Sequence, residues 1–323
     1  MRYVILGAGA IGSVIGGRLF ENGHDVVLVA RGAHLAALAD QGLELRDPDR
    51  SVRLAVATAP SPAQAGLRGG DVALLATKTQ QTEALLVELQ ACAPPGLPVV
   101  CAQNGVENER LALRRFENVQ AMCVFMPATH LEPGVVEVPL SPRTGLLDLG
   151  CYPEGLDDVS EQVAADLNTS GFDSIPDRNV MARKYLKLLS NLGNALQAAC
   201  GTRSDDPAAA ELWDLVQEEG SRCLQAAGIE VADPDLDAAR RAALGAPRPV
   251  GGHDLSHGSS WQSLARGTGN IEADWLNGEI VLLGRLYGVA TPVNELLRST
   301  ANRMATDRIA PGSIAARDLL NQL

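Results

Sequence analysis

The chain has few aromatic residues, no excess of positive charge and no long apolar run, and each deficit narrows the possible functions. Aromatic side chains make up only 3% of the 323 residues, so the core must rely on Leu, Val and Ala. The formal net charge of −12 leaves no basic field to meet nucleic-acid phosphates. No apolar run approaches the roughly eighteen residues of a membrane span. We therefore expect no nucleic-acid partner and no membrane segment.

Metal-binding and disulfide patterns are also missing. The six cysteines contain no Cys-x-x-Cys spacing, and most lie in apolar runs that favour buried thiols. His253 and His257 have helical spacing but lie in a glycine-rich stretch, so we expect a loop role and no metal. An apolar strand begins at Arg2, which leaves no room for a signal peptide. These features favour a cytoplasmic protein without a metal.

The N-terminal segment has the order strand, glycine turn, helix, strand that is typical of a dinucleotide-binding unit. Gly7 permits a tight turn, Gly9 lets the backbone approach a pyrophosphate, and Gly12 allows close packing of helix and strand. The alternative is a glycine-rich turn without a ligand. The predicted cofactor-binding residues of this turn are Gly7, Ala8, Gly9, Ala10, Ile11 and Gly12.

The end of the second strand indicates which dinucleotide is bound. An NAD-preferring protein usually has Asp or Glu there to bind the ribose 2′-hydroxyl. Here the strand ends at Ala30-Arg31-Gly32, and no carboxylate follows before Asp40. A guanidinium suits a 2′-phosphate, so we predict NADP(H), with a solvated loop role for Arg31 as the alternative.

Two later apolar strands of the first half also end in polar residues. The run 71–76 is followed by Lys78, and the run 97–102 is followed by Asn104. Ligands of an open parallel sheet bind at the carboxyl ends of its strands, so both residues are candidates for the cofactor site. The alternative for each is an ordinary turn or cap residue.

The pattern changes from mixed α/β to all-α near Pro176. Segments 135–138 and 145–150 are predicted to complete the sheet, followed by a helix over 158–169 and a short strand over 172–175. Beyond residue 176 only helical patterns occur. The predicted helices are 180–200, 208–227, 232–244, 260–264, 270–287 and 293–303. We therefore predict an α/β Rossmann domain over 1–175 and an all-α domain over 176–323.

The first helix of the second half carries a polar strip. Lys187, Asn191 and Asn194 fall within about 60° of one another on one helical face. Such groups cost free energy when buried without partners, which favours a cleft between the domains. The alternative is a solvated helix face.

Over nearly its whole length the chain resembles the ketopantoate reductases (2-dehydropantoate 2-reductases), which have a helical second domain like that of 6-phosphogluconate dehydrogenase. The resemblance begins with the glycine turn and Arg31. It continues in order through Lys78-Thr-Gln-Gln-Thr82, Asn104-Gly105, Tyr185-Leu-Lys187-Leu-Leu-Ser-Asn191, Ser259-Ser260 and Glu272-Ala-Asp274-Trp-Leu-Asn277-Gly278.

The resemblance implies a role for each matched position. Lys187 would be the general acid that protonates the carbonyl oxygen as hydride arrives, and Lys184 fits that role less well. Glu272 would orient substrate and cofactor ribose as the second catalytic residue. The other matched side chains would contact ligands: Asn191 and Asn194 the substrate, Ser260 its carboxylate, and Lys78 and Asn104 the nicotinamide ribose and the reaction site.

Two departures from the family pattern concern the substrate. Asn194 follows Lys187 by seven residues where the family more often has eight, and 125–130 lacks the usual Thr- and Gly-rich sequence. The expected function is NADPH-dependent reduction of ketopantoate to pantoate, a step of pantothenate synthesis, or of a related small 2-oxo acid. The alternatives are a reductase of another 2-oxo or β-hydroxy carbonyl compound and a non-catalytic NADPH sensor. The resemblance also makes a homodimer plausible.

Overall fold

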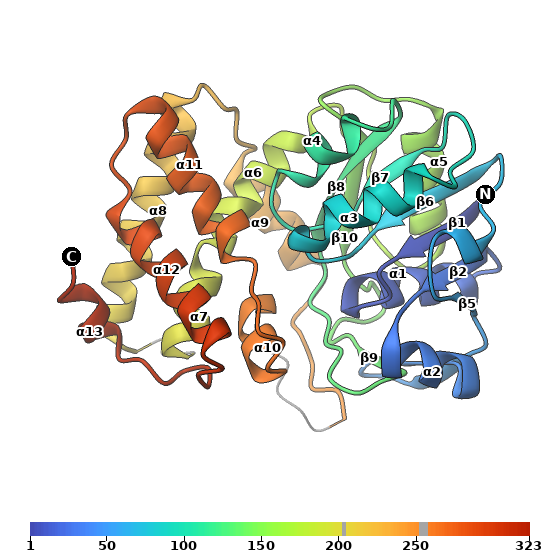
Figure 1. The fold of residues 1–323 in the computed structure, drawn as a ribbon, viewed down its shortest axis with the longest axis horizontal. Helices are drawn as coiled ribbons and strands as arrows, with labels where there is room; N and C mark the ends of the chain where they lie inside the picture. The colour runs from blue at the N-terminus through green and yellow to red at the C-terminus, as the bar shows by residue number, and fades with distance from the viewer. Residues whose placement is uncertain (202–204, 252–257) are drawn as a thin grey trace. The chain divides into compact units, whose positions relative to one another are not determined.

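The computed structural model describes residues 1–201, 205–251 and 258–323, which fall into two compact units (Figure 1). The first, here called the Rossmann unit, comprises Met1–Met181 and also 233–251. The second, the helical unit, comprises Ala182–Ala232 and 258–323. The chain therefore returns to the Rossmann unit after entering the helical one, whereas the sequence suggested a single boundary at 175.

The Rossmann unit is built on a seven-stranded sheet in which all neighbours are parallel except the edge strand β10. Its central strands are continuous apolar runs because helices cover both faces. In spatial order the strands are β10 (Leu146–Cys151), β8 (Val119–Phe125), β7 (Val99–Cys101), β6 (Asp71–Leu75), β1 (Arg2–Leu6), β2 (Asp25–Val29) and β5 (Ala57–Ala59). This confirms the predicted α/β class.

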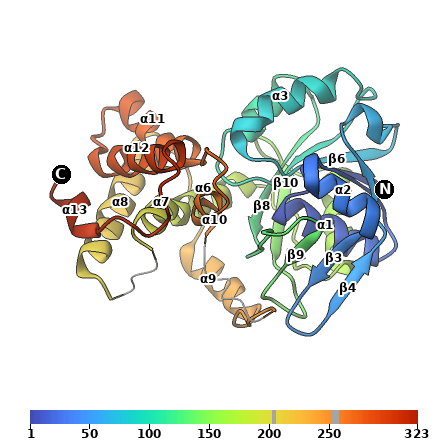
Figure 2. The ribbon, with the colours of Figure 1, turned by 60° about the horizontal axis from the view of Figure 1, so that its bottom comes forward.

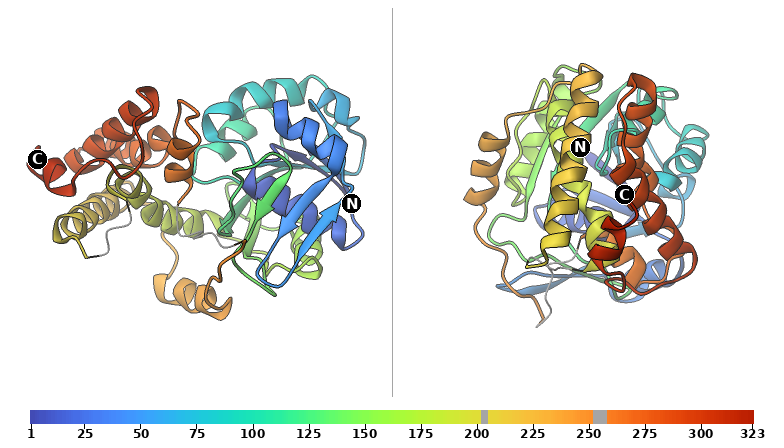
Figure 3. Two further views of the ribbon diagram at one scale, coloured as in Figure 1. Left: turned by 90° about the horizontal axis from the view of Figure 1, so that it is seen from below. Right: turned by 90° about the vertical axis from the view of Figure 1, so that its left-hand side faces the viewer.

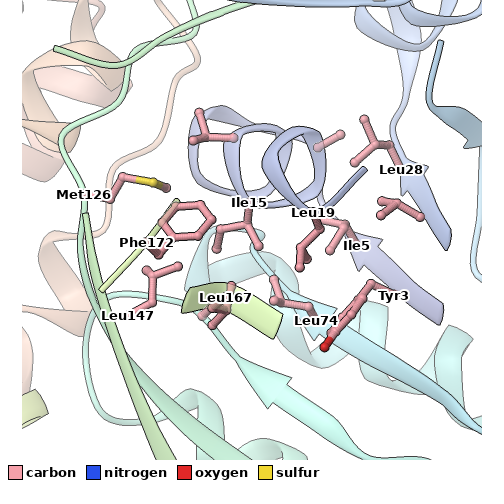
Figure 4. Packing of buried hydrophobic residues seen from close by; sticks show 14 of the residues in the cluster. Tyr3, Ile5, Ile15, Leu19, Leu28, Leu74, Met126, Leu147, Leu167 and Phe172 are labelled. Carbon is pink, nitrogen blue, oxygen red and sulfur yellow. The ribbon is translucent and has the colours of Figure 1, made fainter. Parts of the chain in front are cut away.

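Each face of the sheet has its own core, because alternate residues of β1 point to opposite sides. Tyr3 and Ile5 pack with α1 (Ala10–Glu21) and α5 (Asp158–Thr169), as Figure 4 shows for Ile15, Leu19 and Leu167. The opposite face carries α3 (Thr79–Gln90) and α4 (Asn108–Leu113). With so few aromatics, both cores consist largely of Leu, Val and Ala.

The strand at 135–138 does not complete the main sheet as predicted. It is β9 (Val135–Glu137), which joins β3 (Leu43–Arg46) and β4 (Ser51–Leu54) in a separate three-stranded sheet (Figure 2). The turn at Gly134 starts this pairing, since its carbonyl accepts the Glu44 N–H at 2.8 Å. The edge of the main sheet is taken by β10 instead.

The short strand predicted at 172–175 is also absent. Only isolated bridges form there, from Leu146 to Asp173 and from Leu149 to Pro176. The Asn168 side chain binds both the N–H and the carbonyl of Ser174, at 3.0 and 2.6 Å. An amide that takes both backbone groups of one residue competes with a regular ladder.

The helical unit confirms the predicted all-α second half, with two changes. The expected helix 180–200 is interrupted at Leu192, giving α6 (Val180–Asn191) and α7 (Gly193–Cys200). The expected helix 270–287 starts with a short 3₁₀ turn, η2 (Ala273–Trp275). The other helices are α8 (Pro207–Ala226), α10 (Ser259–Ala265), α11 (Asn277–Tyr287), α12 (Pro292–Thr306) and α13 (Ala316–Leu320). The right-hand view of Figure 3 shows gold α8 alongside dark red α12.

Helix α9 (Pro234–Ala243) belongs to the Rossmann unit, and Arg240 links it there by ion pairs. Arg240 contacts Asp148 of β10 and donates to Asp173 at 2.9 Å. Leu244, directly after the helix, packs with Leu140 and Leu146 in a small apolar cluster. Ion pairs and apolar contact together hold this returning segment on the sheet.

Candidate functional site

The glycine turn after β1 is held by hydrogen bonds to the end of β2 and by close packing against Thr77. Gly7 has φ +104°, a conformation that favours glycine. The N–H groups of Gly7 and Ala8 both donate to the carbonyl of Val29 at the end of β2, at 3.2 and 3.0 Å. A Cβ on Gly7 would lie 2.7 Å from the Cγ2 of Thr77, so the turn is closely packed.

Gly12 and Gly9 differ in what surrounds them. A Cβ on Gly12 would lie 2.2 Å from the carbonyl oxygen of Gly7, whereas one on Gly9 would meet no atom of the described residues within 4 Å beyond its two chain neighbours. Gly9 is the N-cap of α1 and makes no side-chain cap bond, so the helix presents its first N–H groups beside open space. Positive helix ends of this kind bind phosphate, and these residues therefore fit a pyrophosphate.

Lys78 and Asn104 lie at the same edge of the sheet as the glycine turn. Strand β6 pairs with both β1 and β7, with Leu75 opposite Leu6 and Cys101. Lys78 is the N-cap of α3 just beyond β6, and Asn104 follows β7; both are partly exposed. The parallel register thus brings together three of the predicted cofactor-binding segments.

A buried hydrogen-bond network that sequence reasoning missed supports these two positions. Gln103 donates to the Thr77 carbonyl and the Thr82 hydroxyl, at 2.9 and 2.7 Å. Asn108 accepts from Thr82 at 2.8 Å and donates to the backbone carbonyl of Asn104 at 3.2 Å. The segments that carry Lys78 and Asn104 are therefore tied together. The adjacent Gln103-Asn104 pair after an apolar strand was the available signal.

Arg31 lies at the predicted position after β2 and forms an exposed ion pair. Its Nη2 contacts both carboxylate oxygens of Glu88 on α3, at 3.0 and 2.8 Å. Arg31 is also the N-cap of α2 (Gly32–Gln41). An exposed pair of this kind contributes little to stability, so its partner can be exchanged at low cost.

The rings of His34 and His130 contact each other at a tilt of 53°, with centroids 4.2 Å apart, and His34 lies beside Ala8 of the glycine turn. The Nδ1 of His34 accepts the N–H of Gly134 at 2.9 Å, which requires the neutral ring. Burial, followed by the charge of His130, lowers the pKa of His34 from 6.5 to about 4. His130 faces another histidine here, and its Nδ1 lies 3.0 Å from the Val135 carbonyl.

The lowered pKa of His34 makes the free energy of unfolding depend on pH. Unfolding restores the ordinary pKa of His34, so the unfolded chain binds more protons between pH 6.5 and about 4. The contribution of His34 to stability is therefore complete above pH 6.5 and is lost as the pH falls toward 4. We expect His34→Asn, which keeps an acceptor for Gly134, to flatten the fall in melting temperature over this range. If plots of melting temperature against pH run parallel for the variant and the wild type, this prediction is wrong.

The polar strip of the helical unit lies on α6 and α7. Lys184 is 3% exposed and Asn191 is 9% exposed, while Lys187 and Asn194 are partly exposed. The Nδ2 of Asn191 is buried and has no hydrogen-bond partner among the residues that the structure describes. An unpaired buried donor is costly, and an acceptor on a ligand would relieve that cost.

The start of α10 lies against the Asn194 side chain. The N–H of Gly258 donates to Oε1 of Gln197 at 2.7 Å, and a Cβ on Gly258 would lie 3.1 Å from Oδ1 of Asn194. Ser260, in the first turn of α10, is 2% exposed. Within the helical unit the structure therefore brings α10, with Ser260, next to α7, with Asn194.

Glu272 is 4% exposed and is the N-cap of η2. The turn after it is held by Asp274, which accepts from Arg298 and Asn302 of α12, both at 2.7 Å. The carboxylate of Asp274 thus anchors the segment that carries Glu272. Sequence reasoning included Asp274 in a motif without giving it this role.

Two family models match the chain in succession. Residues 3–153 match "Ketopantoate reductase PanE/ApbA", and residues 179–305 match its C-terminal counterpart. The chain belongs to the ketopantoate reductase family. It is an oxidoreductase that acts on a CH–OH/C=O group, as its curated relatives are, and the family uses a nicotinamide dinucleotide.

Relatives that align with more than nine-tenths of the chain are named 2-dehydropantoate 2-reductase. The 2-dehydropantoate 2-reductase of Pyrococcus horikoshii is 28% identical over 309 residues, covering 92% of this chain and 95% of the relative. That of Caulobacter vibrioides is 26% identical over 310 residues, covering 93% and 98%. These alignments support ketopantoate reduction as the activity of this group.

Solved structures confirm the fold. A ketopantoate reductase from Ralstonia eutropha superposes with a TM-score of 0.80 at 27% identity, covering 95% of this chain and 99% of that one. A D-mandelate dehydrogenase with NADH and anilino(oxo)acetate gives 0.81 at 23% identity, with the same coverage. The fold thus occurs in enzymes with different substrates.

Residues 1–201, 205–251 and 258–323 contain no group of three or more His, Cys, Asp or Glu that could hold a metal ion. In the same ranges no helix has the length and hydropathy of a membrane span. His253 and His257 lie outside the described residues.

Proposed function

We propose that this protein reduces 2-dehydropantoate, or a closely related small 2-oxo acid, with NADPH. Asn191 carries the proposal: its Nδ2 is a buried donor with no partner in the described parts of the chain, one helical turn from Lys187. A ligand oxygen that accepts from this amide would lie near an ammonium group. That combination suits a carbonyl substrate, which gains negative charge on oxygen during reduction.

In the proposed reaction, bound NADPH supplies a hydride to the carbonyl carbon. Lys187 donates the proton from Nζ to the carbonyl oxygen, so the C=O group becomes CH–OH and the lysine is left neutral until solvent reprotonates it. Asn191 and Asn194 hold the substrate oxygens, Ser260 donates to the carboxylate, and Glu272 orients substrate and ribose.

The residues of the Rossmann unit would hold the cofactor. The N–H groups at the start of α1 bind the pyrophosphate beside Gly9, while Lys78 and Asn104 bind near the nicotinamide ribose. Arg31 is proposed to bind the 2′-phosphate, which sets the preference for NADPH over NADH. To do so it exchanges its exposed bond to Glu88 for the phosphate.

Arg31→Ala is expected to weaken NADPH binding about tenfold and to leave NADH binding unchanged, since a charge-assisted contact to the 2′-phosphate is lost. Glu88→Gln is the matched variant, because it removes the competing carboxylate and should strengthen NADPH binding. Titration of nicotinamide fluorescence measures both affinities. An NADPH affinity that Arg31→Ala does not change would exclude Arg31 from the 2′-phosphate site.

The function is tested by following NADPH oxidation with 2-dehydropantoate and a short series of other 2-oxo acids. A strong preference for 2-dehydropantoate supports the proposed activity and a role in pantothenate synthesis. Turnover of another acid alone would move the specificity to the region of Asn194 and residues 125–130, where the chain departs from its family. NADPH binding without any turnover would favour a sensor.

A further inference from the structure

The helical backbone hydrogen bonds are interrupted where α6 passes into α7. Side chains from two other helices donate hydrogen bonds to backbone carbonyls at this point. The N–H of Leu192 is shared between the carbonyls of Leu188 and Leu189, both at 3.1 Å. The Leu189 carbonyl also accepts from Nε2 of Gln217 at 2.6 Å, and the Leu192 carbonyl accepts from Nδ2 of Asn277 at 3.0 Å. Side chains inserted into a ladder produce breaks of this kind.

Packing against α8 also constrains the backbone between α6 and α7. Gly193, the first residue of α7, lies against the indole of Trp213, and a Cβ on Gly193 would be 1.8 Å from its Cζ3. Only glycine allows this approach, since any side chain would have to displace the ring. We call Leu189, Leu192 and Gly193, with their contacts to Gln217, Asn277 and Trp213, the α6–α7 junction.

Asn277 connects the junction to a fully buried polar network. It is 1% exposed, and its Nδ2 also donates to Oδ1 of Asn294 at 3.1 Å. Asn294 donates in turn to Glu219 at 2.8 Å, and Glu219 accepts the backbone N–H groups of Val293 and Asn294, each at 2.9 Å. The direct bond from Asn277 holds the Leu192 carbonyl, and Asn277 in turn is linked to the start of α12.

We infer that Asn277 is a positioning residue for the 2-oxo acid and acts through the Leu192 carbonyl on Asn191 and Lys187. The inference rests on the proposed function, in which those two residues handle the substrate. Asn191 directly precedes Leu192, and Lys187 lies one turn earlier on the same helix. Because no acceptor within residues 1–201, 205–251 and 258–323 holds the Nδ2 of Asn191, we infer that the backbone at the junction sets the direction of this amide.

Asn277→Leu tests the inference, with Asn294→Leu as its matched control. Both variants break the same buried network, but only the first removes the bond to Leu192. Well below both melting temperatures, we expect Asn277→Leu to lower kcat/KM for the 2-oxo acid by about 10- to 100-fold, since small misplacements of reacting groups have effects of that size. In Asn277→Leu the KM for the acid should rise and the KM for NADPH should stay unchanged. In Asn294→Leu both KM values and kcat should remain close to those of the wild type.

Equal losses in the two variants, or a lower kcat with an unchanged KM for the acid, would overturn the inference and leave Asn277 a purely structural role. Should Asn277→Leu fail to fold, Gln217→Met removes the other side-chain bond of the junction and should cause a smaller loss in the same direction. An unchanged KM for the acid in Gln217→Met would equally overturn the inference.

The proposed function fails separately, if the wild-type protein oxidises no NADPH with any acid of the series. The junction is then tested by amide hydrogen exchange in its Leu192–Leu196 region. Exchange should be faster in Asn277→Leu than in wild type and unchanged in Asn294→Leu. Equal exchange in Asn277→Leu and wild type would overturn the positioning role.

Discussion

Replacing Lys187 with alanine is expected to lower turnover of the 2-oxo acid about 10²- to 10⁴-fold, the usual contribution of a positioned acid. NADPH affinity should be nearly unchanged, because the proposed cofactor residues of the glycine turn lie in the Rossmann unit. Lys187 is partly exposed on α6, as a proton donor that meets a ligand must be. Stopped-flow NADPH oxidation and fluorescence titration measure the two quantities independently.

Two further variants of α6 separate charge from proton transfer. Lys187→Arg keeps a cation but offers a proton held too tightly to transfer, so it should retain acid binding and lose turnover. Lys184→Met serves as the control on the same helix, since Lys184 is 3% exposed and is expected to have no role in the chemistry. A loss of turnover confined to Lys184→Met would reassign the acid. Equal losses of NADPH affinity and turnover in Lys187→Ala would place Lys187 in the cofactor site.

Gly9→Ala should weaken NADPH binding by about 5- to 100-fold without lowering the melting temperature. Apart from its chain neighbours, the added methyl meets no atom of the described residues within 4 Å, and Gly9 has φ −77°, which any residue adopts. It would occupy the space in which we propose the pyrophosphate lies. Overfilling a close contact by one methyl costs about 1–3 kcal/mol, which corresponds to that range of affinity.

Gly12→Ala provides the contrast. Its Cβ would lie 2.2 Å from the Gly7 carbonyl oxygen, so this variant should lose both thermal stability and NADPH affinity. Differential scanning fluorimetry with and without NADPH reads both effects for the two variants. If Gly9→Ala binds NADPH as wild type does, the pyrophosphate does not lie beside Gly9 and the proposed cofactor geometry is wrong.

The features that sequence predicted well are those written in local patterns. The glycine turn, the continuous apolar strands and the capped helix α5 each depend on neighbouring residues, and all occur where expected. What sequence missed depends on partners far along the chain. Gly193 beside Leu192 is a weak local signal for an interruption of the helix, but Asn277, which holds the Leu192 carbonyl, lies far along the chain.

The candidate site, too, was only partly predictable from local sequence. The chemical roles that the resemblance implies for individual residues stay predictions, and the structure places the glycine turn, Lys78 and Asn104 at one sheet edge through strand register. The supports of those residues were not foreseen. Gln103 and Asn108 act through contacts between segments, and Asp274 acts through Arg298, so no single motif reveals them.

The return of the chain to the Rossmann unit at Asp233 has a consequence for dissecting the protein. In topological terms Ala182–Ala232 is an insertion within a single folded unit, because α9 and Leu244 complete the packing around Leu140 and Leu146. A fragment that stops at Met181 would leave those leucines uncovered and Asp148 without Arg240. Joining residue 181 to residue 233 through a short flexible linker is therefore the way to obtain the cofactor-binding half alone.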